Sequence, residues 1–185
     1  MKKILFSLTA LLVMTACSQS NPETTTQEST ATSTAKVEAL ANEPIDPALA
    51  LQNMQEVQAF LKECDAFFIA TADADQPRVR PFGVSEIIDG RLYIMTGKVK
   101  DVYKQIAANG KFEICALKPS GSEWMRLSGV LVTDETLATK EEFLNRNESL
   151  NAMYKADDAN MALLQVTQAT ARFCSFGAAE RKVTF

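Results

Sequence analysis

The hydrophobic pattern becomes regular after residue 50 and predicts a helix followed by strands. Apolar residues recur at helical spacing at Leu51, Met54, Val57, Leu61 and Cys64. Short apolar runs then predict strands over 66–72, 78–88 and 91–96. A turn cluster over 73–77 closes the first run, and Asp89-Gly90 between the last two is typical of a β-hairpin turn.

The second half of the chain continues with helical and strand patterns in turn. A short helix over 99–108 is expected to end at Asn109-Gly110 in a left-handed conformation. Strands are predicted over 111–117 and 124–134, and Gly129 in the second indicates a bulge or a close backbone approach. The pattern ends with a helix over 137–155, one long strand or a bent pair over 162–176, and an edge strand over 181–185.

Short strands linked by hairpins, with few helices, favour an antiparallel sheet. Closure of such a sheet removes its exposed edges, so the predicted fold is a β-barrel with peripheral helices, of the α+β class. The sequence has no Rossmann G-x-G-x-x-G, no P-loop and no G-x-S-x-G nucleophile elbow. Dinucleotide binding on a dedicated glycine loop is therefore not expected.

The first 17 residues have the pattern of a targeting segment. Lys2 and Lys3 precede an apolar stretch over 4–14 that is too short to span a bilayer. The following residues up to Cys17 resemble a bacterial lipobox, which implies a lipoprotein-type signal peptide over 1–17 and lipidation of Cys17. The alternative is an ordinary secretory signal in which Cys17 has no role. The lipoprotein interpretation implies a lipid anchor on the periplasmic side of the cell envelope, and Ser18 favours the outer membrane.

Composition then sets the domain limits and the classes of chemistry. Residues 18–48 are rich in Thr, Ser, Glu and Ala, which predicts a disordered linker before a folded domain over 49–185. The net charge of −4 argues against nucleic acid as a partner. The absence of histidine excludes histidine-based catalysis and histidine metal ligands, and no metal site is expected. Cys64, Cys115 and Cys174 are interpreted as small buried residues, with one disulfide left possible.

The stretch 92–106 reads as a strand, a Thr96-Gly97-Lys98 turn and an amphipathic helix. The start of a helix offers free N–H groups and a partial positive charge. Together with Thr96, Lys98 and Lys100, this start would bind a phosphate group. The alternative is a solvated corner whose lysines contact only water.

Two further clusters carry candidate binding groups. Arg78 and Arg80 share one face of a strand, where they repel each other unless an anion or a carboxylate lies between them. The next residues, 81–83, interrupt that strand; the alternative is an edge strand with solvated arginines. Trp124, with Arg126 two residues later, could stack on a flat ligand or simply cap the core.

Taken together, the segments QPRVRPFG, LYIMTGKVKDVYKQI, EICAL and WMRLSG resemble the FMN-binding split β-barrel family, the pyridoxamine 5′-phosphate oxidase-like proteins. The resemblance covers about residues 55–185 and is strongest to small single-domain members of the general-stress and nitroimidazole-reductase type. It implies an antiparallel split barrel that binds FMN, and a homodimer with the flavin at the interface.

By position, the resemblance assigns Arg80, with the backbone of Pro81, Phe82 and Gly83, to the flavin ring. The implied FMN-binding set is Arg78, Arg80, Pro81, Phe82, Gly83, Met95, Thr96, Lys98, Lys100, Trp124 and Arg126. Lys98 and Lys100 match the region that holds the phosphate. The chain lacks the carboxyl-terminal Arg-x-His of the true oxidase, and Ser85 replaces its substrate-side lysine, so oxidation of pyridoxamine phosphate is not expected.

Three functional hypotheses follow from this resemblance. The first is an FMN-dependent oxidoreductase, a reductase acting on a small molecule. The second is a lipoprotein that binds flavin or haem without turnover, because cytoplasmic NAD(P)H does not reach the periplasm. The third is an interaction domain that has lost its ligand. The sequence names neither the substrate nor the electron donor.

Overall fold

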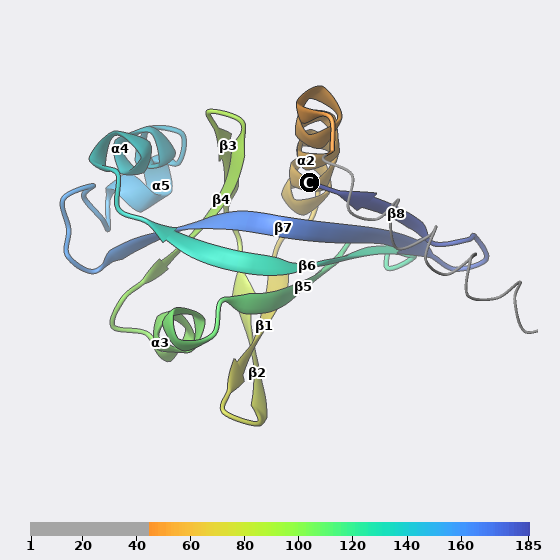
Figure 1. The fold of residues 1–185 in the computed structure, drawn as a ribbon, viewed down its shortest axis with the longest axis horizontal. Coiled ribbons are helices and arrows are strands. Elements are labelled where there is room, and N and C mark those ends of the chain that lie inside the picture. Colours follow the sequence, from red (N-terminus) through yellow and green to blue (C-terminus); the bar gives the residue numbers. More distant parts are fainter. Residues whose placement is uncertain (1–44) are drawn as a thin grey trace, which may run out of the picture. The chain divides into compact units, whose positions relative to one another are not determined.

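Helix α2 (Pro47–Lys62) opens the part of the chain that the computed structural model describes, residues 45–185 (Figure 1). Its start is capped by Asp46, whose Oδ1 accepts a hydrogen bond from the backbone N–H of Ala48 at 2.7 Å. The predicted apolar face is buried from Met54 onward, whereas Leu51 is exposed. The predicted signal peptide, the lipobox Cys17 and the linker up to residue 44 lie outside the described residues, and residues 47 and 48 belong to α2.

The strands form one antiparallel sheet, as predicted. They are β1 (Phe67–Asp73), β2 (Gln76–Phe82), β3 (Ser85–Ile88), β4 (Arg91–Gly97), β5 (Lys111–Leu117), β6 (Glu123–Asp134), β7 (Met161–Ser175) and β8 (Arg181–Thr184). Their order is β2-β1-β5-β6-β7-β4-β3, with β8 beside β7. The barrel is open, because the end strands β2 and β3 do not pair with each other. The split-barrel class is therefore confirmed, but full closure is not.

The segment predicted as one interrupted strand, 78–88, supplies both ends of this open sheet. Strand β2 ends at Phe82 and β3 begins at Ser85, so only Gly83 and Val84 link the two end strands. Pro81 has no N–H to donate, which weakens the ladder where the chain leaves β2. This link therefore spans the gap between the unpaired end strands β2 and β3, and we call this gap the seam of the barrel.

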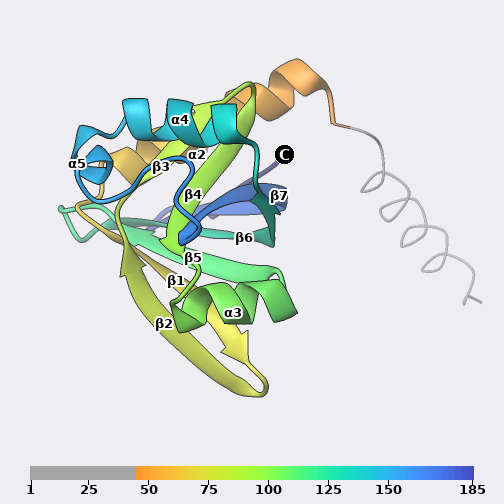
Figure 2. The same ribbon diagram turned by 90° about the vertical axis from the view of Figure 1, so that its left-hand side faces the viewer.

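Three helices follow α2 and pack around the sheet (Figure 2). Helix α3 (Asp101–Ala108) packs against β1 and β4, and α4 (Leu137–Asn145) packs against β3. The single helix predicted over 137–155 is divided into α4 and α5 (Glu148–Asn151). Asn147 marks the division, because its Nδ2 donates to the carbonyl of Phe143 at the end of α4.

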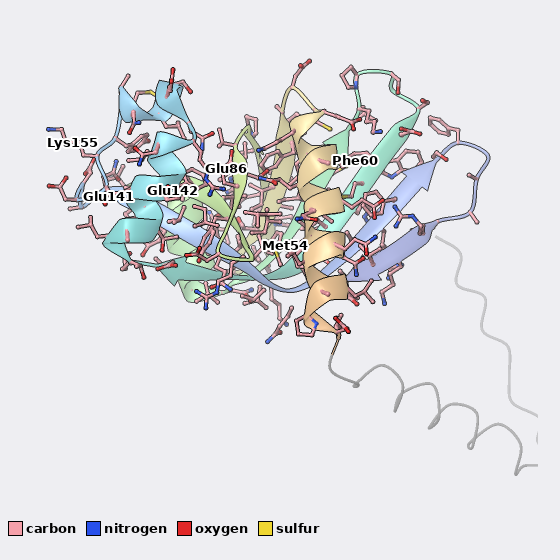
Figure 3. The ribbon with its side chains drawn as sticks, turned by 90° about the horizontal axis from the view of Figure 1, so that it is seen from above. Met54, Phe60, Glu86, Glu141, Glu142 and Lys155 are labelled. Carbon is pink, nitrogen blue, oxygen red and sulfur yellow. The ribbon has the colours of Figure 1, made fainter. Side chains whose placement is uncertain are left out.

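Two hydrophobic clusters hold the domain together. The larger lies between α2, α3 and the sheet and contains Val57, Ile69 and Leu127, each fully buried. The smaller lies beneath α4 and contains Tyr93 and Phe143. Figure 3 looks onto α2, with Met54 and Phe60 on it and Glu86 of β3 beside it. Glu86 accepts hydrogen bonds from Gln58 and Lys62, which tie the helix to this end strand.

The glycine and turn predictions have mixed outcomes. The hairpin at Asp89-Gly90 is confirmed, with φ of 48° and 71°, both left-handed. The left-handed stop after α3 is wrong, because Asn109 is extended with φ −149°. Gly110 is instead required by a close approach, since a Cβ there would lie 2.8 Å from the carbonyl oxygen of Leu131. The predicted irregularity at Gly129 is confirmed as a bulge between β6 and β7.

Candidate functional site

A cleft of about 450 Å³ lies at the seam of the barrel. It is lined by Arg80, Pro81, Phe82, Gly83, Val84, Met95, Thr96, Lys100, Val102, Leu150, Met153 and Tyr154. These residues come from the end of β2 and the link to β3, from β4, from the start of α3, and from α5 with the loop after it. Seven of the residues predicted from the sequence therefore meet in one place: Arg80, Pro81, Phe82, Gly83, Met95, Thr96 and Lys100.

Arg80 is the fixed cation of this cleft. Its Nη1 donates to the hydroxyl of Thr71 at 2.5 Å and its Nη2 donates to Oε1 of Gln105 at 2.6 Å. Both acceptors are neutral, and no carboxylate within residues 45–185 forms an ion pair with Arg80. Burial, and then the positive charge of Arg78, lower the pKa of Arg80, whereas the negative charges of Asp101 and Asp73 act in the opposite direction. An anionic or electron-rich group in the cleft would stabilise the Arg80 charge further.

The start of α3 adds a second positive region to the cleft. Lys100 is the N-cap residue, and no side chain accepts a hydrogen bond from the first backbone N–H groups of the helix. These groups and the helix dipole favour a negative charge at this end. The exposed ammonium group of Lys100 adds a full positive charge on the same side of the cleft. The combination suits a phosphate group.

The remaining walls of the cleft are largely apolar. Val84 lines it from the link between β2 and β3, Met95 from β4 and Val102 from α3. Leu150 lines it from α5, and Met153 and Tyr154 from the loop that follows α5. Met153 lines the cleft while 65% of its surface is exposed, so part of the apolar lining is accessible to solvent. The three α5-side residues were not predicted as site residues. Their spacing at 150, 153 and 154 would place them on one face of the helix predicted over 137–155, but no local signal says what that face covers.

Lys98 does not line the cleft, although it was predicted to bind phosphate together with Lys100. Its Nζ lies 2.7 Å from a carboxylate oxygen of Glu135, and this hydrogen bond raises the pKa of Lys98. Glu135 also binds the buried ammonium group of Lys140 at 2.6 Å. Lys98 therefore joins the turn before α3 to the start of α4, and Lys100 is the lysine that faces the cleft.

Three other predicted residues also lie outside the cleft. Arg78 shares a face with Arg80 but is exposed and pairs with Asp73 at 3.1 Å. Trp124 packs against Phe176 with a ring-centroid separation of 5.3 Å. Arg126 pairs with Glu113 across β5 and β6. Nothing in residues 45–185 brings these side chains to the cleft of the same chain.

The cysteines and the acidic residues do not form a second centre. Cys64 is buried as predicted, but Cys115 is exposed and Cys174 is half-buried, so the uniformly buried interpretation is wrong for these two. All three thiols are free. Across residues 45–185, no three Cys, Asp or Glu side chains gather closely enough to hold a metal ion. None of the helices described there is long and apolar enough to cross a bilayer.

Residues 52–184 match the family described as pyridoxamine 5′-phosphate oxidase like. The match spans more than half of the chain, and the chain belongs to this family. It thus extends from α2 through β8 and includes every residue of the cleft. No curated protein matches the chain.

Solved structures share the fold. A NimC/NimA family protein from Clostridium acetobutylicum is 37% identical, covers 75% of this chain and 96% of its own length, and has a TM-score of 0.72. A general stress FMN/FAD-binding protein from Xanthomonas citri is 17% identical with a TM-score of 0.51, and the alignment covers 68% of this chain and 92% of that protein. A haem-binding protein from Mycobacterium smegmatis is 12% identical with a TM-score of 0.54, and the alignment covers 77% of this chain and 59% of that protein. The last two likenesses concern the fold alone.

Proposed function

We propose that the protein is an FMN-binding flavoprotein and that it acts as a reductase on a small molecule. The observation that carries this proposal is that one cleft combines two cationic side chains, Arg80 and Lys100, with a largely apolar lining. FMN combines the matching groups, an anionic phosphate and a flat ring system. Membership of the pyridoxamine 5′-phosphate oxidase-like family supports this choice of ligand, and the general stress FMN/FAD-binding protein shows that the same fold can hold a flavin.

Each part of the cleft has a role in this proposal. Lys100 and the first two N–H groups of α3, those of Asp101 and Val102, bind the phosphate, because no hydrogen-bond acceptor within residues 45–185 occupies these two groups. Arg80 is held rigidly by Thr71 and Gln105, so it can offset charge at the polar edge of the ring. The apolar side chains exclude water from the ring, which strengthens the electrostatic contacts.

The chemistry of the reaction would come from bound flavin, which supplies hydride and electron transfer. The protein then needs no side chain as general acid or base, which agrees with a sequence that contains no histidine. The same lack of histidine removes the Arg-x-His pattern of the true oxidase. Pyridoxamine phosphate oxidation is therefore not part of the proposal.

The first experiment measures flavin binding to the purified protein by absorption and fluorescence titration with FMN. Lys100→Ala should weaken FMN binding by about tenfold or more, the scale of a lost charge-assisted hydrogen bond. Lys104→Ala is the matched control, because Lys104 lies on the same helix but pairs with Asp101 at 2.8 Å. A protein that takes up no FMN, or a Lys100→Ala variant that binds it as tightly as the wild type, contradicts the proposal.

A non-catalytic flavin- or haem-binding lipoprotein is the second candidate. One prediction and one observation favour it: the leader predicts an envelope location, where cytoplasmic NAD(P)H is absent, and the fold is shared with the haem-binding protein from Mycobacterium smegmatis. Anaerobic reduction of the flavin-loaded protein by candidate donors, followed by reoxidation with nitroaromatic and quinone acceptors, separates the two. Flavin binding without turnover by any donor would favour this second function, and a haem spectrum without flavin uptake would replace FMN by haem.

We also propose that the protein forms a homodimer through one face of the sheet. Phe68 and Val79 point outward from β1 and β2 and leave 48% and 63% of their surfaces exposed. Phe68 is flanked in the ladder by Pro81 and Cys115, so the exposed apolar surface is continuous across three strands. We name this surface, Phe68, Val79, Pro81 and Cys115, the outward face. A second copy is the occupant that best fits it, because Pro81 belongs both to this face and to the cleft.

The dimer proposal also assigns a flavin-binding role to two predicted residues, Trp124 and Arg126, that do not line the cleft of their own chain. Arg126 is paired with Cys115 in the ladder between β5 and β6, so it lies next to the outward face, on the same side of the sheet. Trp124 is two residues away and lies on the same side of β6. Both side chains would then reach a flavin only in the cleft of the second copy.

Finally, we propose that residues 1–17 direct the protein to the cell envelope and that Cys17 carries the lipid anchor. Metabolic labelling with a fatty-acid probe should mark the full-length wild type and place it in the membrane fraction. Cys17→Ser should lose both the label and the membrane association. Cys115→Ser is the matched control, because Cys115 is an exposed free cysteine of the folded domain. Label retained in Cys17→Ser contradicts the assignment.

A further inference from the structure

Asn160 binds the turn that leads from β4 into α3. Its backbone carbonyl accepts the N–H of Lys98 at 2.7 Å, which extends the β4–β7 ladder by one bond. Its side-chain Oδ1 accepts the N–H of Val99 at 3.0 Å. Two consecutive N–H groups of the turn are therefore fixed by one residue. The next residue, Lys100, is the N-cap of α3 and lines the cleft.

The surroundings of Asn160 hold its side chain in this position. Its backbone N–H donates to Oδ1 of Asp158 at 2.8 Å, which fixes the loop before β7. A Cβ on Gly97 would lie 3.2 Å from both the nitrogen and the oxygen of the Asn160 amide. The lack of a side chain at Gly97 therefore makes room for this amide. The amide is thus enclosed between Gly97 and the N–H of Val99.

We infer that Asn160 is a positioning residue for the phosphate of the bound cofactor; the inference rests on the proposed function. Asn160 does not line the cleft, so its side chain would not contact a ligand bound there. It fixes the backbone direction at residues 98 and 99, and this direction determines where Lys100 and the free N–H groups of α3 point. Since hydrogen bonds to a phosphate depend on distance and angle, a looser turn weakens the phosphate contacts and leaves the ring contacts unchanged.

The test compares FMN with riboflavin, which has the same ring but no phosphate. Dissociation constants for both are measured by fluorescence titration of the wild type and Asn160→Ala. The variant should bind FMN about 3- to 10-fold more weakly, as expected for the loss of one hydrogen bond. Its affinity for riboflavin should stay within about twofold, as for a substitution outside the ring site. Asn53→Ala is the matched control, because it also removes one side-chain-to-backbone hydrogen bond, to Thr184 at 2.9 Å.

A second variant disturbs the same contact from the other side and keeps Asn160 itself. Gly97→Ala would press its Cβ on the amide of Asn160, and it carries no left-handed backbone strain. It should lower the preference for FMN over riboflavin in the same direction as Asn160→Ala. It also serves as the test if Asn160→Ala does not fold, which thermal unfolding will show.

The outcomes separate this inference from the proposed function. If the wild type binds neither flavin, the proposed function fails and the inference fails with it. If the wild type prefers FMN, a selective loss of FMN affinity in the variants supports a positioning role. Equal weakening of both flavins, or no change in either, overturns the inference and leaves the proposed function intact.

Discussion

Arg80 of β2 and Gln105 of α3 are joined by a hydrogen bond of 2.6 Å between Nη2 and Oε1. The same Oε1 also accepts the hydroxyl hydrogen of Thr71, again at 2.6 Å. One amide oxygen thus connects two neighbouring strands to the helix that forms the cationic end of the cleft. Thr71 and Gln105 are both buried, so water cannot easily replace a lost partner.

Gln105→Met removes this acceptor while keeping a side chain of similar length. We expect it to lower the free energy of unfolding by about 1–3 kcal/mol, because the hydroxyl of Thr71 and the Nη2 of Arg80 lose their acceptor. Urea unfolding followed by circular dichroism measures the change. Gln76→Met is the matched control, because the side chain of Gln76 is exposed and bonds only to the neighbouring carbonyl of Pro77. Equal stability of the two variants would contradict the role of Gln105.

Much of the cleft could be predicted from the sequence because its residues are close together in the chain. Arg80 to Gly83 follow one another, and Thr96 and Lys100 flank one turn. The choice between Lys98 and Lys100 could not be made in this way. It depends on Glu135, which lies far along the chain and draws Lys98 away from the cleft.

The apolar wall from α5 was missed for a similar reason. Leu150, Met153 and Tyr154 are brought to the cleft by the folding of a distant segment, and periodicity reports a face without its partner. The strands themselves were recognisable from local patterns, but the division of 78–88 into the two ends of the sheet was not. That division depends on strand pairing across the whole domain.

Gly129→Ala should destabilise the domain by about 1–3 kcal/mol, the usual cost of overpacking. A Cβ at this bulge would lie 2.7 Å from the carbonyl oxygen of Thr167 and 3.2 Å from the Cα of Ala169, both backbone atoms. Gly83→Ala is the control, because a Cβ there meets nothing within 4 Å. Urea midpoints measure both variants. A Gly129→Ala midpoint equal to that of Gly83→Ala would contradict the predicted clash.

Glu135 should make the stability of the domain depend on acid pH. Burial acts to raise the pKa of Glu135, but hydrogen bonds from Lys140 and Lys98 outweigh it, so the pKa lies below the usual 4.5. A carboxyl group whose pKa is lower in the folded state stabilises the fold at any pH above its pKa in the unfolded chain. This contribution is lost as the pH falls through the pKa in the folded state. The acid-dependent loss of stability therefore begins near pH 4.5 and continues below it.

Glu135→Gln tests this dependence by thermal unfolding between pH 7 and pH 3, a range chosen to bracket the carboxyl titration. The variant should be less stable than the wild type by about 1 kcal/mol at pH 7, since half of the Glu135 side chain is exposed and water screens the pair. The difference should shrink as pH falls below about 4.5. Glu141→Gln, on the exposed side of α4 (Figure 3), makes the same charge change and should show no such trend. A difference that stays constant with pH would rule out the pairing as its cause.

Val79→Lys should convert the proposed homodimer into a monomer. Val79 lies on the outward face with 63% of its surface exposed, so lysine is tolerated in the single chain. In a dimer the same position is covered, and two buried ammonium groups would lose their hydration without a partner. Light scattering coupled to size-exclusion chromatography measures the mass directly. Leu49→Lys is the matched control, because Leu49 is 49% exposed on α2, away from the outward face.

A wild type that is already monomeric at micromolar concentration, or a Val79→Lys variant that remains dimeric, would show that the outward face is not the interface. Because Pro81 is shared between this face and the cleft, the monomeric variant should also bind FMN more weakly than the Leu49→Lys control.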